Sequence, residues 1–449
     1  MKAEARNSTV SPARAAAFEI LMRVDREDAF ASELLHSRRI ERLSSADHGL
    51  ATELVLGMLR WRSCLDGAVA NASSQPLAKL DPEVLNALRL AVYQLGWLDR
   101  VPARAAINES VEIVKAARKR SAAGFVNAVL RKLAADRSWC EAHAAELSPR
   151  ALAGQFAHPL WLVERWAAEF GIADAAKICA YDQQTPVTAI RLRDPQAEDG
   201  LRAAGIELAH GALLADARRV TSGDITNTSA FRQGRVVIQD EASQLIAALL
   251  GQASRLLDCC AAPGSKTSAF ADQNPDASIV AADLHPHRAR VLRRLVTTTH
   301  LHVIAADARD LPISAQFDRV LADVPCSGTG TLARNPEIKW RLRPDDFPDL
   351  HARQVSILAS ALVHVTRGGR MLYSTCSLER EENEDVVNEV ISGTKAYQIL
   401  DCSKELQSLR ESGRLAWADT ASLTRGPFLH TTPGIHPCDG FFAALIERI

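Results

Sequence analysis

The feature that most constrains the fold is a regular alternation of strand-like and helix-like segments that begins near Gly234. Short apolar segments at residues 256–257, 279–283 and 303–307 are separated by longer stretches with helical spacing. Strands that alternate with helices in this way form a parallel sheet with helices on both faces. We therefore predict a doubly wound α/β domain over residues 234–449.

Two later strands of this domain each end in a cysteine-containing loop. The apolar run 317–321 leads into DVPCSGTG (residues 323–330), and the run 370–373 leads into STCS (residues 374–377). A single cysteine after a strand is more often a buried core side chain. Here both thiols are flanked by small polar residues, and consecutive strands tend to be neighbours. We therefore expect Cys326 and Cys376 to face one pocket at the carboxyl edge of the sheet, where ligands bind in such folds.

The first strand-to-helix turn has the sequence DCCAAPGSKT (residues 258–267). Its small residues let the backbone approach a ligand, and the following helix offers free N–H groups. A phosphate loop would need glycine in place of Cys260 and Ser265, and a dinucleotide loop would need G-x-G-x-x-G. The turn therefore predicts a nucleoside ligand without a phosphate chain.

Acidic residues at the ends of the next two strands support the same ligand. Asp283 is placed to bind ribose hydroxyls, and Asp307 is placed to meet an adenine edge. The alternative for either residue is a helix cap or a solvated loop acid. S-adenosylmethionine, which has a ribose, an adenine and a charged sulfonium but no phosphate, matches the whole set.

The two thiols indicate what that methyl donor would be used for. Carbon 5 of a pyrimidine is a poor nucleophile, and addition of a thiolate to carbon 6 activates it. The proton on carbon 5 must leave before the protein–base bond can break, so a second group at the site is useful. Asp323 is expected to hydrogen-bond the ring nitrogen and stabilise the covalent adduct.

The first 140 residues have the apolar spacing of an all-helical domain. Helices are predicted after Ser11, at residues 46–61, after Asp81, at 103–120 and at 122–135. Residues 1–150 carry 22 Lys+Arg against 18 Asp+Glu, whereas the remainder carries 31 against 36. This asymmetry favours RNA contact by the front of the chain, with Lys119 and Arg120 as candidates. The alternative is a solvated helix face.

Residues 141–160 contain two X-Pro pairs and are predicted to be a linker, followed by a small α+β subdomain at 161–233. Nine cysteines without a C-x-x-C pair indicate neither a disulfide framework nor a zinc site, so no metal is expected. The chain start lacks a signal-peptide core, and no apolar run is long enough to span a bilayer. We therefore expect a cytoplasmic protein with no membrane partner, acting as a monomer.

These segments resemble the successive motifs of a known family. The stretches LLDCCAAPGSKT, VAADLHPHR, AADARDLP, FDRVLADVPCSGTGTLARNPEIKW and GGRMLYSTCSLEREENEDVV are similar to those of the bacterial RNA cytosine-5 methyltransferases of the Sun/Fmu group. The resemblance covers residues 234–449, and the helical front is similar to the RNA-binding domain that resembles the antitermination factor NusB. It implies a Rossmann-like methyltransferase domain with a seven-stranded, mostly parallel sheet.

The resemblance also implies roles for individual residues. Cys376 would be the nucleophile, and Cys326 would help release the product. The implied ligands of S-adenosylmethionine are Cys260, Ala261, Ala262, Pro263, Gly264, Ser265, Lys266, Asp283, Asp307 and Asp323. Two residues depart from the family pattern, because Ser265 replaces a glycine and Val324 replaces an alanine. We expect Ser265 to alter cofactor affinity without abolishing activity.

Lys339 and Arg341 follow Asn335-Pro336-Glu337 and are candidates to clamp the RNA backbone, with ordinary surface charge as the alternative. The expected function is S-adenosylmethionine-dependent methylation of carbon 5 of a cytosine in 16S ribosomal RNA. The same chemistry on transfer RNA is one alternative. A non-enzymatic RNA-binding assembly factor is the other.

Overall fold

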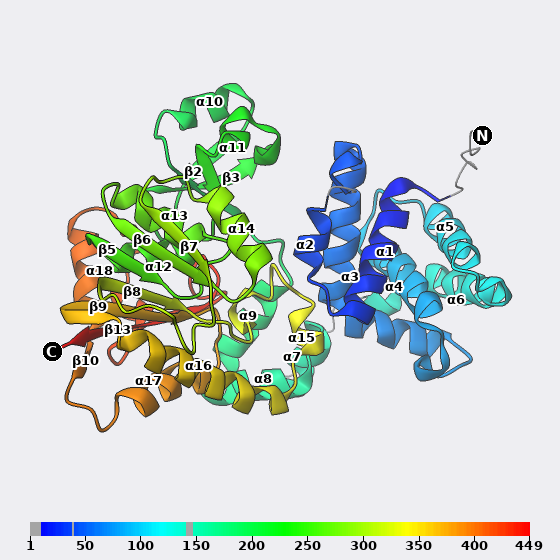
Figure 1. Ribbon diagram of the computed structural model, residues 1–449. Coiled ribbons are helices and arrows are strands. Elements are labelled where there is room, and N and C mark those ends of the chain that lie inside the picture. Colours follow the sequence, from blue (N-terminus) through cyan, green and yellow to red (C-terminus); the bar gives the residue numbers. More distant parts are fainter. Residues whose placement is uncertain (1–9, 38–39, 141–146) are drawn as a thin grey trace. The chain divides into compact units, whose positions relative to one another are not determined.

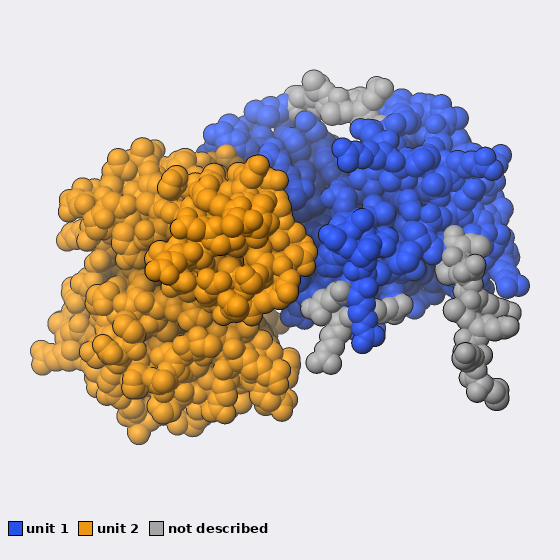
Figure 2. Space-filling model, turned by 90° about the horizontal axis from the view of Figure 1, so that it is seen from above, with its two compact units in different colours: residues 1–185, 332–341 blue, residues 186–331, 342–449 orange. Residues whose placement is uncertain are grey.

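The computed structural model describes residues 10–37, 40–140 and 147–449. The chain forms two compact units, shown in different colours in Figure 2. The helical unit comprises residues 1–185 together with 332–341, and the sheet unit comprises residues 186–331 and 342–449.

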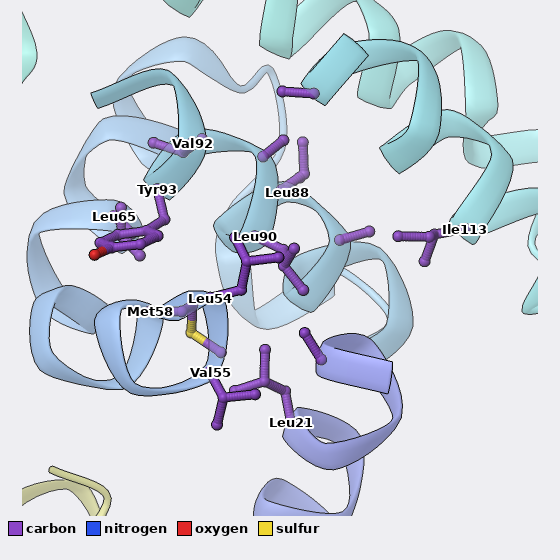
Figure 3. Close-up of a cluster of buried hydrophobic side chains, with 14 of the residues drawn as sticks. Leu21, Leu54, Val55, Met58, Leu65, Leu88, Leu90, Val92, Tyr93 and Ile113 are labelled. Carbon is purple, nitrogen blue, oxygen red and sulfur yellow. The ribbon is translucent and has the colours of Figure 1, made fainter. Parts of the chain in front are cut away.

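The helical unit is built mainly from long amphipathic helices. Its helices are α1 (Pro12–Glu27), α2 (Ala31–Leu35), α3 (Ser45–Ala72), α4 (Pro82–Trp97), α5 (Ala103–Ala116), α6 (Ala123–Ala135), α7 (Pro149–Gln155), α8 (Leu160–Phe170), α9 (Ile172–Asp182) and α15 (Ile338–Arg341). Helix α4 is central, and its residues from Asn86 to Leu95 are buried on every side. Figure 3 shows Leu88 and Val92 of α4 in the apolar cluster that also holds Leu21, Leu54 and Met58.

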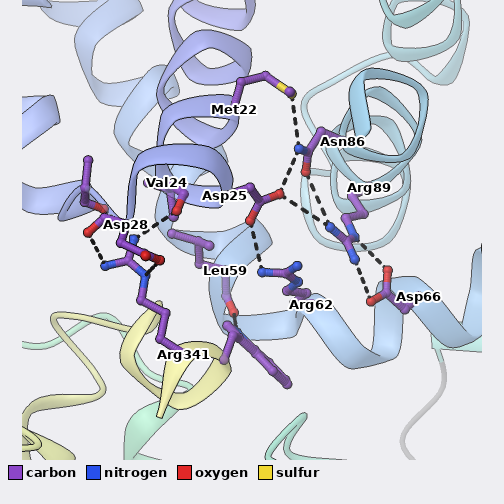
Figure 4. A network of polar contacts seen from close by, with 12 residues as sticks. Met22, Val24, Asp25, Asp28, Leu59, Arg62, Asp66, Asn86, Arg89 and Arg341 are labelled. Carbon is purple, nitrogen blue, oxygen red and sulfur yellow. Dashed lines mark hydrogen bonds and ion pairs between the residues drawn. The ribbon is translucent and has the colours of Figure 1, made fainter. Parts of the chain in front are cut away.

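A polar network joins α1, α3 and α4, and within it Asn86 and Arg89 are buried. Asp25 accepts a hydrogen bond from Asn86 Nδ2 at 2.9 Å and pairs with Arg62 at 3.1 Å (Figure 4). Arg89 binds both carboxylate oxygens of Asp66, at 2.6 and 2.8 Å. Each charge has a partner of opposite sign, so the network satisfies the polar groups that helix packing removes from water.

One predicted helix ends earlier than its pattern indicated. The spacing predicted a helix over residues 103–120, but α5 ends at Ala116 and Arg118 has a φ of 64°. A left-handed residue cannot continue a right-handed helix, so the chain turns there before α6 begins.

The predicted domain boundaries also differ from the observed units. Residues 141–146 of the predicted linker lie outside the described residues, and the rest of it forms α7 and the start of α8. The segment 161–185, expected in the α+β subdomain, is helical and belongs to the helical unit. Residues 332–341, expected in the α/β domain, belong to the helical unit as well.

A small antiparallel sheet begins the sheet unit. Its strands are β1 (Thr188–Leu192), β2 (Glu207–His210), β3 (Ala217–Ser222) and β4 (Val236–Ile238), in the order β2-β3-β1-β4. The helices α10 (Ala197–Ala203) and α11 (Ser229–Arg232) accompany it. Because β4 pairs with β1, this subdomain extends past the predicted boundary at residue 233.

The large sheet has a parallel centre in the order β9-β8-β5-β6-β7 (Figure 1). Its strands are β5 (Arg255–Asp258), β6 (Ser278–Asp283), β7 (Leu301–Ala305), β8 (Phe317–Asp323), β9 (Val365–Thr375), β10 (Tyr397–Leu400), β11 (Thr424–Arg425), β12 (Phe428–Thr431) and β13 (Phe441–Arg448). Strand β13 is antiparallel to β9. Within the described residues the sheet has nine strands rather than the expected seven, because the short hairpin β11–β12 adds to the edge of β13.

Helices cover both faces of this sheet, as the alternation predicted. They are α12 (Glu241–Leu249), α13 (Ser265–Gln273), α14 (Pro286–Leu295), α16 (Phe347–Leu362), α17 (Glu384–Ile391) and α18 (Cys402–Glu411). Neighbouring residues of one strand belong to opposite cores: Leu256 packs in the cluster with α12, α13 and α18, and Leu257 packs in the cluster with α16 and α17. This is the two-residue period of a strand buried on both faces. None of the described helices is long and apolar enough to cross a membrane.

Candidate active site

The two cysteine loops lie side by side because β8 and β9 are parallel neighbours. Asp323 at the end of β8 is in register with Ser374 near the end of β9. The Sγ atoms of Cys326 and Cys376 are 3.4 Å apart, and both residues are partly exposed. The two thiols therefore converge, as predicted, and the pocket that both were expected to face stays a prediction.

The two thiols differ in their surroundings. The contact with Cys376, together with burial, raises the pKa of the Cys326 thiol well above its usual value, and the carboxylate of Glu382 acts in the same direction. A thiol with a raised pKa keeps its proton at neutral pH. Either sulfur can be the donor in the contact between the two thiols.

Glu382 is a site residue that the sequence interpretation missed. Its side chain is fully buried and accepts hydrogen bonds from the Ser327 N–H at 2.8 Å, the Ser377 hydroxyl at 2.5 Å and Gln354 Nε2 at 2.9 Å. Its sequence signal was weak, because it lies in the acidic run Glu381–Glu384 and looks like one of several surface carboxylates.

Asp323 is held at the same edge by two donors. Lys266 Nζ lies 2.6 Å from Asp323 Oδ2, and the Ser374 hydroxyl donates to Oδ1 at 2.8 Å. Lys266 also lies over the ring of Phe441, 4.9 Å from its centroid. The Asp323 side chain is 28% exposed, so it can still meet a ligand at this edge.

In the loop between β5 and α13, the backbone at Gly264 packs closely against other side chains of this protein, and the predicted approach to a ligand stays a prediction. Gly264 has a φ of 112°, and a Cβ atom there would lie 2.6 Å from Leu292 of α14 and 2.8 Å from Val296, the residue after that helix. Both observations exclude a larger residue at this position. Ser265 is the first residue of α13, and the loop residues 260–264 lie beside the free N–H groups of its amino end.

The acids at the strand ends fall into three different environments. Asp258 is buried and accepts a hydrogen bond from the Thr267 hydroxyl at 2.6 Å, and burial raises its pKa to about 7. Asp283 ends β6 and accepts the His285 N–H at 2.9 Å. Asp307 lies two residues beyond β7 rather than at its end. Its carboxylate pairs with Arg309 at 2.6 Å, and hydrogen bonds from Arg309 lower its pKa.

The candidate RNA-contacting residues lie in the helical unit. Arg120 is exposed, but Lys119 Nζ pairs with Asp81 at 3.0 Å. Arg341 donates hydrogen bonds to the carbonyl oxygens of Asp28 at 2.8 Å and Val24 at 3.1 Å (Figure 4). Its guanidinium thus satisfies carbonyl oxygens at the carboxyl end of α1. These contacts do not fit the predicted contact between Arg341 and the RNA backbone.

Lys339 is the clearest correction to the predicted site. Its side chain is 1% exposed, and within the described part of the chain its Nζ has no hydrogen-bond partner. Burial lowers the pKa of Lys339 to about 7. An ammonium group enclosed in the helical unit cannot reach an RNA phosphate, so the prediction of RNA contact is wrong for this residue.

The burial of Lys339 predicts a pH-dependent stability. Between about pH 7 and its unfolded pKa of 10.5, the unfolded chain binds a proton that the folded chain has released. The contribution of Lys339 to the free energy of unfolding should therefore rise with pH across this window, by up to roughly 4 kcal/mol between pH 7 and 10. Buried thiols with raised pKa, such as Cys259 and Cys438, contribute with the opposite sign above about pH 8.5, so the Lys339 contribution is read as a difference between variants. Below pH 7 the penalty is present in full.

Denaturant unfolding of the wild type and of Lys339→Met over pH 6–10 would measure this effect. The free energy of unfolding of the wild type should increase relative to that of Lys339→Met as pH rises from 7 to 10. Lys404→Met, which removes an exposed lysine, should follow the wild type. Parallel pH curves for the wild type and Lys339→Met would contradict the assignment.

The parallel sheet, the small-residue loop and the paired thiols define the class of protein as a Rossmann-like methyltransferase. Residues 247–447 match the family model described as 16S rRNA methyltransferase RsmB/F, and residues 11–135 match the NusB family. The chain is 36% identical to the probable ribosomal RNA small subunit methyltransferase B of Bacillus subtilis, over 96% of this chain and 98% of that protein. It is 34% identical to ribosomal RNA small subunit methyltransferase B of Pseudomonas putida, over 84% of this chain and 88% of that protein.

The chain therefore belongs to the family of ribosomal RNA small subunit methyltransferases B, with a NusB-type helical domain at its front. The fold is shared with the crystal structure of PH0851, which superposes with a TM-score of 0.78 at 21% identity, over 98% of this chain and all of that one. The predicted family and fold class are confirmed.

Proposed function

We propose that this protein uses S-adenosylmethionine to methylate carbon 5 of a cytosine in 16S ribosomal RNA. The observation that carries the proposal is the pair of sulfur atoms 3.4 Å apart at the carboxyl edge of a parallel sheet. Methyl transfer to a nitrogen or oxygen atom needs no thiol, whereas transfer to a pyrimidine carbon needs one for activation. Membership of a family described as 16S rRNA methyltransferases supports the choice of substrate.

The loop and the strand-end acids fit the cofactor. The amino end of α13 presents backbone N–H groups beside the loop, and Asp283 at the end of β6 is the candidate for the ribose hydroxyls. Lys266 is engaged by Asp323, so it is not free to neutralise a phosphate chain. Residues 260–266 with Asp283, Asp307 and Asp323 are the proposed binding set.

The chemistry of this chain's residues follows from the thiol pair. When bound, S-adenosylmethionine supplies an electrophilic methyl group. The thiolate of Cys376 forms a bond to carbon 6 of the base, and the electron pair of the C5–C6 double bond makes carbon 5 nucleophilic. After carbon 5 is methylated, its proton passes to solvent water and the electron pair left on carbon 5 re-forms the C5–C6 double bond. The bond between Cys376 and carbon 6 then breaks, which returns the sulfur as a thiolate and restores the aromatic ring. Cys326 is placed to assist this release.

Asp323 is proposed to hold the base during these steps. Lys266 and Ser374 fix its carboxyl group at the mouth of the two loops, where it can contact the ring nitrogen of the cytosine. A base stacked in a helix is inaccessible at carbon 6, so the target cytosine must be unpaired or turned out of its stack.

Methylation of purified 16S ribosomal RNA and of transfer RNA, side by side with labelled S-adenosylmethionine, tests the proposal. Label is expected in 16S ribosomal RNA, as 5-methylcytosine after digestion to nucleosides. Label in transfer RNA alone would favour the alternative substrate. Absence of label from both RNAs and from small-subunit particles would favour a non-enzymatic assembly factor.

A further inference from the structure

A single buried carboxylate joins the two cysteine loops. Glu382 ends a short 3₁₀ turn, Arg380–Glu382, that follows the second thiol loop. Its Oε1 accepts the N–H of Ser327, and its Oε2 accepts the hydroxyl of Ser377 at 2.5 Å as well as the hydroxyl of Ser327. Each serine directly follows one of the two cysteines, so the carboxylate fixes both thiols relative to each other.

A fourth donor, the side chain of Gln354, links Glu382 to Pro325, the residue before Cys326. Gln354 Nε2 on α16 lies 2.9 Å from Glu382 Oε1 and 3.0 Å from the carbonyl oxygen of Pro325. The loop around Cys326 is therefore held from both sides, through Pro325 and through Ser327. The loop around Cys376 is held through Ser377, whose hydroxyl also accepts the N–H of Glu379 at 3.0 Å.

All of these partners donate hydrogen bonds to Glu382, which is the environment of an ionised carboxylate. Its negative charge disfavours a second negative charge on the neighbouring Cys326 sulfur. Of the two thiols, Cys326 is the one held by both Glu382 and Gln354. The arrangement thus places the two cysteine loops in different hydrogen-bond environments.

We propose that Glu382 is a positioning residue that sets the distance between the two thiols and, through its negative charge, disfavours a thiolate at Cys326. Cys376 is then the thiol that ionises and reacts. This inference rests on the proposed function, because it explains how two adjacent cysteines take separate roles in one reaction. It adds a group that acts through Ser327 and Ser377 rather than by touching the substrate.

The test compares the wild type with Glu382→Gln, which keeps the size of the side chain but removes its charge. In the wild type, brief treatment with iodoacetamide at pH 8 should alkylate Cys376 and spare Cys326, as read by peptide mass spectrometry. In Glu382→Gln, the alkylation rate of Cys326 should rise at least about 10-fold and its pH midpoint should fall. Methylation should lose about 100-fold in kcat with little change in KM for RNA.

Asp385→Asn is the matched control, since Asp385 lies three residues away and pairs with the exposed Arg380. Asp385→Asn should leave the alkylation rate of Cys326 and the kcat of methylation unchanged. Ser327→Ala removes the hydrogen bond from the Ser327 hydroxyl to Glu382. It should raise the alkylation rate of Cys326 by an intermediate amount, which keeps the inference testable even if Glu382→Gln fails to fold. An unchanged alkylation pattern in folded Glu382→Gln and in Ser327→Ala would overturn the inference. Because alkylation needs no RNA, this outcome is separate from a failure of the wild type to methylate 16S ribosomal RNA.

Discussion

Replacement of Cys376 by alanine is expected to abolish methylation, with a loss of at least about 1,000-fold in kcat. Without the thiolate, no bond to carbon 6 can form and carbon 5 of the cytosine remains a poor nucleophile. Binding of S-adenosylmethionine should be retained, because Cys376 lies on the loop after β9 rather than in the loop between β5 and α13.

The measurement is single-turnover methylation of 16S ribosomal RNA with labelled cofactor, together with cofactor titration by calorimetry. Cys64→Ala is the control, since Cys64 is a partly exposed thiol of the helical unit. Retention of more than a tenth of the wild-type rate in Cys376→Ala would rule out a covalent role for this thiol.

Replacement of Cys326 by alanine is expected to trap the covalent protein–RNA adduct, whereas replacement of Cys376 prevents it from forming. The first covalent step should proceed, but release of the base should stall, so that a protein–RNA adduct resistant to denaturant accumulates. The physical reason is the position of Cys326, whose sulfur lies 3.4 Å from the sulfur that must leave carbon 6. We expect most of the enzyme to be trapped in the presence of RNA and cofactor.

Gel electrophoresis under denaturing conditions would detect the adduct as a slowly migrating band. The band should disappear in the double variant Cys326→Ala/Cys376→Ala, because the adduct needs the Cys376 sulfur. Normal turnover of Cys326→Ala without an adduct would show that Cys326 has no part in release.

Much of the sheet unit could be predicted from local sequence. Each strand and the helix after it form a continuous stretch of sequence, and the spacing of its apolar residues predicts which side chains are buried. Right-handed crossovers then place the carboxyl ends of the parallel strands at one edge of the sheet. The convergence of Cys326 and Cys376 followed from that rule alone. The small residues before Ser265 indicated an approach of the backbone to a ligand, whereas the close neighbours at Gly264 are Leu292 and Val296.

The predictions that failed concern contacts between segments far apart in the chain. Lys339 and Arg341 looked like solvent-exposed charges because nothing in their own segment shows that residues 332–341 pack with helices from the first 185 residues. There Trp340 Nε1 donates to the carbonyl oxygen of Leu59 at 2.6 Å, and Glu337 accepts the N–H of Ala31 at 2.9 Å. Such pairings leave no periodic signal in the sequence.

The amino-acid sequence by itself determined the doubly wound sheet, the edge at which the reactive groups gather, and the identity of the two thiols, because each of these depends on local periodicity and on the handedness of connections. Only the tertiary structure decided that Glu382 joins the two cysteine loops and that Lys339 is enclosed. The physical reason is that burial and hydrogen bonding of a charged side chain depend on residues brought to it from elsewhere in the chain, and a carboxylate or an ammonium has the same local signature whether it is solvated or enclosed.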